Sequence, residues 1–230
     1  MTGSVIAGES LEMRFPSEAG PVAALRGATI HVGRGEIVLL EGPSGSGKTT
    51  LLSVLAGMLT PSKGSVEVEG REITRLPRSE RTRLRLERLG FIFQSFNLIR
   101  ALTARENVDV VLQARGFDAG KRRRTIDEVL ALLDIADKGD RFPAQLSGGE
   151  QQRFAVARAL VGEPALILAD EPTSSLDQEN GGAVTGLLCS LARERGAGVL
   201  IASHDPRIRP FVDRSVRIVD GRCDNGTGAA

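Results

Sequence analysis

The sequence predicts an α/β domain in which a mainly parallel sheet is flanked by helices. Short apolar segments with the length and composition of buried strands recur along the chain, and segments with helical periodicity separate them. Near the N-terminus the strand-like segments alternate between apolar and polar residues, which favours an additional antiparallel sheet. A chain of 230 residues is long enough to bury a substantial core.

The first half of the chain supplies both kinds of strand. EIVLLE (36–41) reads as a buried strand that ends at a glycine loop, and TTLLSVLAG (49–57) continues as a helix. SVEVEG (65–70) alternates and stops at a turn, so it fits an antiparallel hairpin near the strands LEMRF (11–15) and ATIHV (28–32).

The middle of the chain predicts helices between two groups of strands. After the strand GFIF (90–93), Thr103 to Glu106 forms a capping box, and KRRRTIDEVLALLD (121–134) is amphipathic. Further strands are expected at ALILAD (165–170), GVLIAS (198–203) and SVRIVD (215–220). We therefore predict one domain over 1–230, with an α/β core at about 1–95 and 161–222, an inserted helical subdomain at about 96–160, and a tail at 223–230.

Composition limits the classes of function. The net charge of +1 provides no strong overall field for nucleic acid or lipid, so no nucleic-acid partner is expected. Cys189 and Cys223 lack the spacing of a metal or redox site, and Cys189 falls on an apolar helix face, which predicts a buried thiol. Because no apolar run approaches membrane-spanning length and MTGSVIAGES lacks a signal pattern, we expect a cytoplasmic protein.

GPSGSGKT (42–49) matches the phosphate-binding loop G-x-x-x-x-G-K-[ST], and it lies between a predicted strand and helix, as the mechanism requires. Glycines allow backbone N–H groups to surround phosphates at the positive end of the helix. Lys48 would reach the β- and γ-phosphates of a bound nucleotide, and Thr49 would give an oxygen to Mg²⁺. The predicted nucleotide-binding residues of this loop are Gly42, Pro43, Ser44, Gly45, Ser46, Gly47, Lys48, Thr49 and Thr50.

Acidic residues follow a second buried strand. LILADE (166–171) delivers Asp170 and Glu171 at the end of this strand. Asp170 would hold Mg²⁺ as the second half of the phosphate-loop pair. Glu171 is placed to polarise the attacking water.

LSGGEQQR (146–153) predicts a second anion site. Ser147 and Glu150 form a capping box that begins a helix, yet Gly148 and Gly149 lie between them and weaken its first turn. A helix start of this kind lets another group approach bare backbone amides. The sequence alone thus offers two phosphate-facing loops.

This pairing of motifs resembles the ATP-binding cassette ATPases over nearly the whole chain. The resemblance implies a P-loop NTPase core with a RecA-like, mainly parallel sheet, an N-terminal antiparallel β subdomain and an inserted helical subdomain. It also implies a head-to-tail homodimer, in which each ATP lies between the phosphate loop of one copy and the LSGGE segment of the other.

The resemblance assigns four further residues. Gln94, in FIFQSFNLI, matches the glutamine that contacts Mg²⁺ and the attacking water. Asp177, in EPTSSLD, matches the aspartate that reaches across the dimer, and His204, in ASHD, matches the histidine that contacts the γ-phosphate. Phe15 occupies the place of the aromatic residue that stacks on adenine, although a core position in an N-terminal strand is the alternative.

Several stretches, including LTARENV and SHDPRI, look most like the separate-chain ATPases of lipoprotein release, macrolide export and cell-division complexes. Amino-acid-importer ATPases share many of these features and are the alternative. The resemblance implies permease subunits on separate chains as partners, and a peripheral location on the inner face of the cell membrane. Ser95 to Arg105 match the groove that receives a permease helix, with Phe96, Leu98 and Ile99 as apolar contacts or as internal packing.

Two classes without membrane coupling are less well supported. The first is a soluble cassette ATPase acting on DNA or ribosomes. A DNA-acting relative would carry a long coiled coil between its phosphate loop and LSGGE segment, and no sustained heptads occur there. Ribosome-associated relatives generally carry two cassettes in one chain, and this chain has room for one. A nucleotide-binding module without turnover would be favoured by loss of Lys48 or Glu171, and both are present.

The segment 71–90 is rich in arginine, with Arg81, Arg85 and Arg88 on one predicted helix face. A basic amphipathic helix can bind anionic lipid, but a solvated face balanced by glutamates is the simpler interpretation. The same holds for KRRR (121–124).

Overall fold

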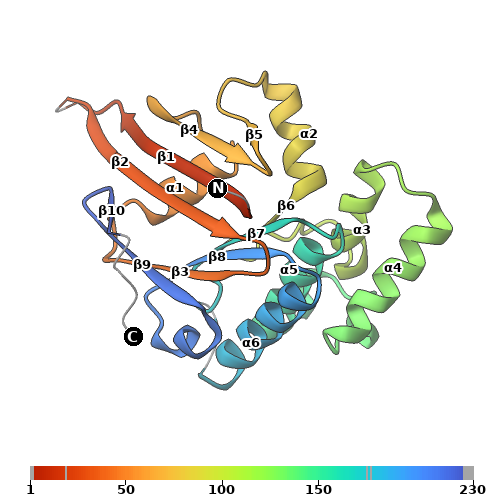
Figure 1. Cartoon of the computed structure of the whole chain (residues 1–230). Coiled ribbons are helices and arrows are strands. Elements are labelled where there is room, and N and C mark those ends of the chain that lie inside the picture. The colour runs from red at the N-terminus through yellow and green to blue at the C-terminus, as the bar shows by residue number, and fades with distance from the viewer. Residues whose placement is uncertain (1–2, 19, 175, 177, 225–230) are drawn as a thin grey trace.

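We analysed a computed structural model, which describes residues 3–18, 20–174, 176 and 178–224, without the side chains of 178–180. The described residues form two sheets with helices around them (Figure 1). The antiparallel sheet has the order β2-β1-β4-β5, and its strands are β1 (Ser4–Phe15), β2 (Val22–Gly33), β4 (Lys63–Val68) and β5 (Arg71–Glu72). The larger sheet has the order β10-β9-β3-β8-β7-β6, with β3 (Ile37–Glu41), β6 (Leu89–Ile92), β7 (Leu166–Asp170), β8 (Gly198–Ala202), β9 (Arg214–Val219) and β10 (Arg222–Asp224).

The larger sheet is parallel from β9 to β6, and β10 pairs antiparallel with β9. Every residue of β7 and β8 is buried, as expected for strands covered on both faces. Along β3, Ile37 and Leu39 belong to one hydrophobic cluster, whereas Val38 and Leu40 belong to the other. The core therefore consists of two layers, one on each face of this sheet.

The helices cover the larger sheet and extend to one side of it (Figure 1). The α-helices are α1 (Lys48–Leu55), α2 (Arg78–Arg88), α3 (Ala104–Ala114), α4 (Ala119–Leu132), α5 (Gly148–Leu160) and α6 (Gln178–Glu194). The described residues also form the short 3₁₀ helices η1 (Ala136–Lys138), η2 (Pro143–Gln145) and η3 (Pro206–Phe211). In the described part of the chain, no helix has the length and apolarity needed to cross a bilayer.

The predicted fold class is confirmed, and the predicted strands occur. Most of their boundaries shift by one or two residues, but β1 begins seven residues and β2 six residues before the predicted segments 11–15 and 28–32. The capping box of α3 is also present, with the Thr103 hydroxyl accepting from the Glu106 N–H and the Glu106 carboxylate accepting from the Thr103 N–H. α4 begins two residues before the predicted segment because the carboxylate of Asp118 caps it by accepting from the N–H of Lys121.

On the predicted basic face of α2, all three arginines contact other parts of the protein. Arg81 donates to the hydroxyl of Thr60 at 2.5 Å, and Arg85 donates to the carbonyl of Gly57 at 2.9 Å. Arg88 lies 3.4 Å from the carboxylate of Glu69. These contacts hold α2 against the end of α1 and the antiparallel sheet, which favours the structural interpretation over lipid binding.

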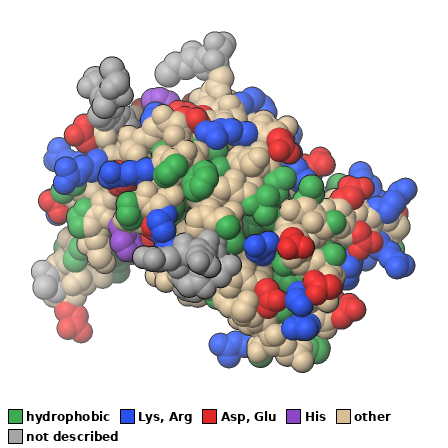
Figure 2. Space-filling view, turned by 90° about the horizontal axis from the view of Figure 1, so that it is seen from below, with side chains coloured by type: hydrophobic (Ala, Val, Ile, Leu, Met, Phe, Trp, Pro, Cys, Tyr) green, Lys and Arg blue, Asp and Glu red, His purple; other side chains and the backbone are tan. Residues whose placement is uncertain are grey.

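Charged side chains of both signs intermix over the end of the molecule formed by α3 and α4, as Figure 2 shows. Within the KRRR segment, Arg122 pairs with Asp109 at 2.7 Å, and Lys121 lies over the ring of Phe117. The structure therefore supports a solvated, internally balanced surface at this segment.

Candidate functional site

The loop between β3 and α1 bends sharply around a cavity. Gly45 and Gly47 have φ values of 78° and 105°, in the left-handed region that favours glycine. A side chain at Gly42 would collide with the carbonyl of Ile218, 2.2 Å from the position of its Cβ. The cavity has a volume of about 540 Å³ and is lined by Ala24, Gly42, Pro43, Ser44, Gly45, Gly47, Lys48, Thr49, Thr50, Gln94, Glu171 and His204.

Lys48 begins α1 and turns its ammonium group back over the loop. Its Nζ donates to the carbonyls of Gly42 at 2.8 Å and Pro43 at 3.2 Å. The same nitrogen lies 3.9 Å from Oε1 of Glu171. The Lys48 side chain is 9% exposed, so this positive charge is directed into the cavity rather than into solvent. It is suited to holding an anion there.

Oxygen ligands suitable for Mg²⁺ gather at the end of β7. The pKa of Asp170 is raised above its usual value. Burial is the main cause, the charge of Glu171 adds to it, and a hydrogen bond from Thr49 opposes it. Oδ1 of Asp170 is buried and has no hydrogen-bond partner among the described residues. Since Mg²⁺ prefers oxygen ligands, this unpaired oxygen, the Thr49 hydroxyl and the amide of Gln94 at the cavity wall fit the ion.

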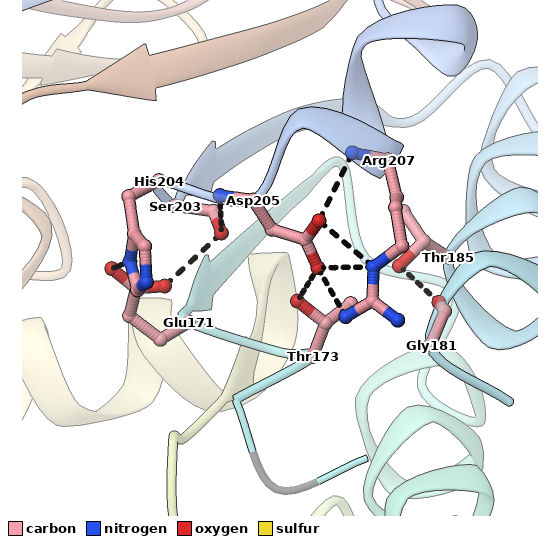
Figure 3. Close-up of polar contacts among 8 residues, drawn as sticks. All are labelled: Glu171, Thr173, Gly181, Thr185, Ser203, His204, Asp205 and Arg207. Carbon is pink, nitrogen blue, oxygen red and sulfur yellow. Dashed lines mark hydrogen bonds and ion pairs between the residues drawn. The ribbon is translucent and has the colours of Figure 1, made fainter. Parts of the chain in front are cut away.

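Glu171 and His204 follow the neighbouring strands β7 and β8, and their side chains meet (Figure 3). Nδ1 of His204 lies 3.0 Å from Oε1 of Glu171. The hydroxyl of Ser203 donates to the other carboxylate oxygen, Oε2, at 3.0 Å. Glu171 has a φ of 45°, which turns the chain back at the strand end and directs the carboxylate toward the cavity. A carboxylate held beside an imidazole in this way can accept a proton from water.

The LSGGEQQR segment forms the predicted capped helix start. The Ser147 hydroxyl accepts from the N–H of Glu150 at 3.2 Å, and the Glu150 carboxylate accepts from the N–H of Ser147 at 2.8 Å. Gly148 and Gly149 open α5 and are half-buried. None of these four residues lines the phosphate-loop cavity, as far as the chain is described.

The structure does not bring the remaining predicted residues into the described lining of the nucleotide cavity. Phe15 ends β1, pairs with Val22 and is 37% exposed, but it is not part of the described cavity lining. Asp177 lies outside the described residues. Leu98 packs against the core, whereas Ile99 is 47% exposed. Internal packing is therefore observed for Leu98, whereas a permease contact at the exposed Ile99 stays a prediction.

Sequence reasoning missed three residues near the site. Ala24 lines the cavity from β2, and no local signal marks it. Ser203 and Asp205 flank His204, and their side chains connect to Glu171 and Thr173. Ser203 and Asp205 could have been predicted from the sequence as supporting residues, because both are polar and directly flank the predicted functional residue His204.

A comparison with protein families shows which family this chain belongs to. The family model described as ABC transporter matches residues 25–174, which include the phosphate loop, the LSGGE segment and Glu171. The chain belongs to the ABC transporter family. This ABC ATPase binds and hydrolyses ATP, so the predicted family and enzyme class are confirmed.

Relatives of this ABC ATPase agree with the predicted branch. It is 41% identical to lipoprotein-releasing system ATP-binding protein LolD 2 of Caulobacter vibrioides, over 97% of this chain and 98% of that protein. It is 44% identical to macrolide export ATP-binding/permease protein MacB 1/2 of Paracoccus denitrificans over 94% of this chain, but it spans 32% of that protein. The ATP-binding cassette MJ0796, solved as a dimer with ADP and Pi, has a TM-score of 0.89 and 33% identity, covering 97% of this chain and 100% of that one.

Proposed function

We propose that this ABC ATPase works as a head-to-tail homodimer that powers a membrane partner on separate chains. The observation that carries the proposal is the separation of the two anion sites. The phosphate-loop cavity is lined by Lys48, Glu171 and His204, whereas the capped glycine start of α5 contributes nothing to its described lining. A second copy that presents Ser147 and Gly149 would complete the nucleotide site. The dimeric form of the similar cassette MJ0796 supports this arrangement.

In the proposed mechanism, the loop amides and Lys48 bind the phosphates of ATP. Asp170 and Thr49, with Gln94, would hold Mg²⁺, which neutralises charge on the phosphate oxygens when bound. Glu171 orients the attacking water and accepts its proton, and His204 contacts the γ-phosphate. Because phosphoryl transfer depends mainly on positioning and charge stabilisation, a monomer with half of each site should hydrolyse ATP poorly.

Two further roles belong to this proposal. Phe15 would stack on adenine, which its partial exposure at the end of β1 permits. Asp177 would reach across the dimer toward the partner copy. Gly148 would present its backbone N–H to the nucleotide bound by the partner copy, and Glu150 would hold this helix start in place through its capping box with Ser147.

We propose a permease of the lipoprotein-release and macrolide-export kind as the membrane partner, on the strength of the LolD 2 and MacB relatives. The exposed side chain of Ile99 would contact a cytoplasmic segment of that partner, while Leu98 supports the loop from the core. The ATPase would then lie on the inner face of the cell membrane without crossing it.

Glu171→Gln tests the dimer and the assignment of the base. This substitution removes the proton acceptor but keeps the shape, so ATP binding should persist while hydrolysis falls by about 100-fold or more. A dimer that depends on ATP and Mg²⁺ should accumulate on size exclusion. The control is Glu128→Gln on the exposed face of α4, which should behave as wild type. Monomeric elution at saturating ATP would contradict the sandwich.

Gly149→Glu tests whether the second anion site acts in trans. The added carboxylate would oppose a partner's phosphates, so turnover should be lost while the ATP affinity of the monomer is retained. Gly120→Glu is a matched control because Gly120 is also the second residue of a capped helix, α4. Gly120 belongs neither to the LSGGE segment nor to the described lining of the nucleotide cavity. Equal loss of ATP affinity and turnover in Gly149→Glu would show that this loop serves only its own chain.

A further inference from the structure

A compact polar cluster lies beside the Glu171–His204 pair (Figure 3) and outside the described lining of the nucleotide cavity. It consists of Thr173, in the loop that follows β7, and of Asp205 and Arg207, in the segment that follows β8, where Asp205 caps η3 and Arg207 lies within it (Figure 3). The two loops are separated by about thirty residues in sequence, as the interval from Thr173 to Asp205 shows. Their contact is therefore a tertiary feature of the site.

The carboxylate of Asp205 joins the two loops. Its Oδ2 accepts from the hydroxyl of Thr173 at 2.7 Å and from Nη2 of Arg207 at 2.6 Å. Its Oδ1 accepts from the backbone N–H of Arg207 at 3.0 Å. The hydrogen bond from the Arg207 side chain holds the pKa of Asp205 well below its usual range, so the group is ionised. Charge-assisted hydrogen bonds of this kind are shorter and stronger than neutral ones.

The network continues from Asp205 to Glu171. The backbone N–H of Asp205 donates to the hydroxyl of Ser203 at 3.1 Å, and that hydroxyl donates to Glu171 Oε2 at 3.0 Å. Because a serine hydroxyl has one proton, accepting from Asp205 orients this proton toward Glu171. Ser203 is fully buried, and its hydroxyl is thereby fixed between the two loops.

Local backbone conformation explains why such a connection is needed. Glu171 has a φ of 45°, which is unfavourable for a residue other than glycine. A strained conformation persists only where the surrounding structure holds it. Thr173 lies two residues after Glu171 and is 3% exposed, and Asp205 directly follows His204. The Thr173–Asp205 hydrogen bond is thus a second side-chain connection between the two segments, in addition to the Ser203–Glu171 hydrogen bond, and it lies directly beside the reacting pair.

We propose that Thr173 and Asp205 are positioning residues whose hydrogen bond holds Glu171 and His204 in the geometry required for ATP hydrolysis. This inference rests on the roles proposed above for Glu171 and His204. Neither residue needs to touch the nucleotide. Loss of their bond should let the two loops separate, which lowers the rate of the chemical step while the phosphate loop continues to bind nucleotide.

Thr173→Val is the principal test because it removes the hydroxyl and keeps the shape. We expect kcat to fall by about tenfold or more, since a displacement of about 1 Å in a catalytic group can reduce a rate by about 100-fold. KM for ATP and Kd for ADP should stay within about twofold of wild type, and Thr173→Ser should restore kcat. A merely structural role would lower thermal stability without this separation of kcat from Kd.

Thr185→Val is the matched control. Thr185 is equally buried and appears in the same region of Figure 3, but its hydroxyl donates to the carbonyl of Gly181 within its own helix. Its kcat should remain at the wild-type value. Equal loss of kcat in Thr173→Val and Thr185→Val, or no rescue by Thr173→Ser, would overturn the proposal.

Asp205→Ala provides a second variant in case Thr173→Val folds poorly, because it removes the acceptor of the Thr173 hydroxyl. Its kcat should fall similarly, and the double variant with Thr173→Val should lose little more than either single variant, because both remove one connection. Wild-type kcat in Asp205→Ala would overturn the proposal. If Glu171→Gln is inactive while Thr173→Val is fully active, only the positioning role fails. Normal hydrolysis by Glu171→Gln would refute the assignment of the base, and the positioning role with it.

Discussion

Two physical effects can require glycine in the phosphate loop: a positive φ, and a neighbouring atom that leaves no room for a Cβ. Three glycines of the loop show these effects singly or together. Gly45 has a φ of 78° but open space where a Cβ would lie. Gly42 lies outside the left-handed region, but its Cβ would be 2.2 Å from the carbonyl of Ile218. Gly47 combines a φ of 105° with a Cβ position 2.6 Å from the carbonyl of Ala24. Alanine at each position therefore tests backbone strain, steric overlap, or both.

The two effects predict an order of destabilisation. Strain alone should lower the free energy of unfolding of Gly45→Ala by about 1–2 kcal/mol. Overlap with backbone, which cannot yield like a flexible side chain, should lower that of Gly42→Ala by about 1–3 kcal/mol. Gly47→Ala should lower the free energy of unfolding by the sum of these two ranges, about 2–5 kcal/mol, because strain and overlap both act at this residue.

Urea unfolding followed by far-UV circular dichroism measures these differences, and it should be done without nucleotide because bound ligand adds to apparent stability. Gly182→Ala is the control, since that helical glycine has open space and no unusual φ, and it should be neutral or stabilising by about 1 kcal/mol. If Gly47→Ala is no less stable than Gly45→Ala, the overlap with Ala24 does not matter and the reasoning is refuted.

Three further predictions concern other parts of the fold. Gly186→Ala should lower the melting temperature, because its Cβ would lie 2.9 Å from the ring of Phe211 and push η3 from α6; an unchanged value would contradict this packing. Burial raises the pKa of Cys189 to about 12 and that of Cys223 to about 11, so at pH 8 about one Cys223 thiol in a thousand is ionised; fast labelling by a thiol reagent before unfolding would be inconsistent with this. Ser147→Ala should destabilise α5 by about 1 kcal/mol in chemical unfolding, and a change below about 0.3 kcal/mol would show that its capping box is dispensable.

Much of the fold was predictable because its signals are local. The apolar segments that became β3, β7 and β8 are continuous, since a parallel sheet covered by helices buries both faces of each strand. The capping boxes at Thr103 and Ser147 depend on residues three positions apart, and both were readable directly. Helix boundaries were less accurate, as at α4, where a cap outside the amphipathic pattern begins the helix.

The candidate site divides in the same way. By itself, the sequence determined the phosphate loop, because its glycines, Lys48 and Thr49 act within one strand–loop–helix unit. It also determined that Asp170 and Glu171 follow a buried strand. Only the tertiary structure decided that the ends of β7 and β8 lie side by side, which brings His204 to Glu171 and Thr173 to Asp205. These contacts join residues about thirty positions apart. Their geometry depends on the order of the strands in the sheet and on the φ of Glu171. Neither property produces a pattern of residue types that could be recognised in the sequence.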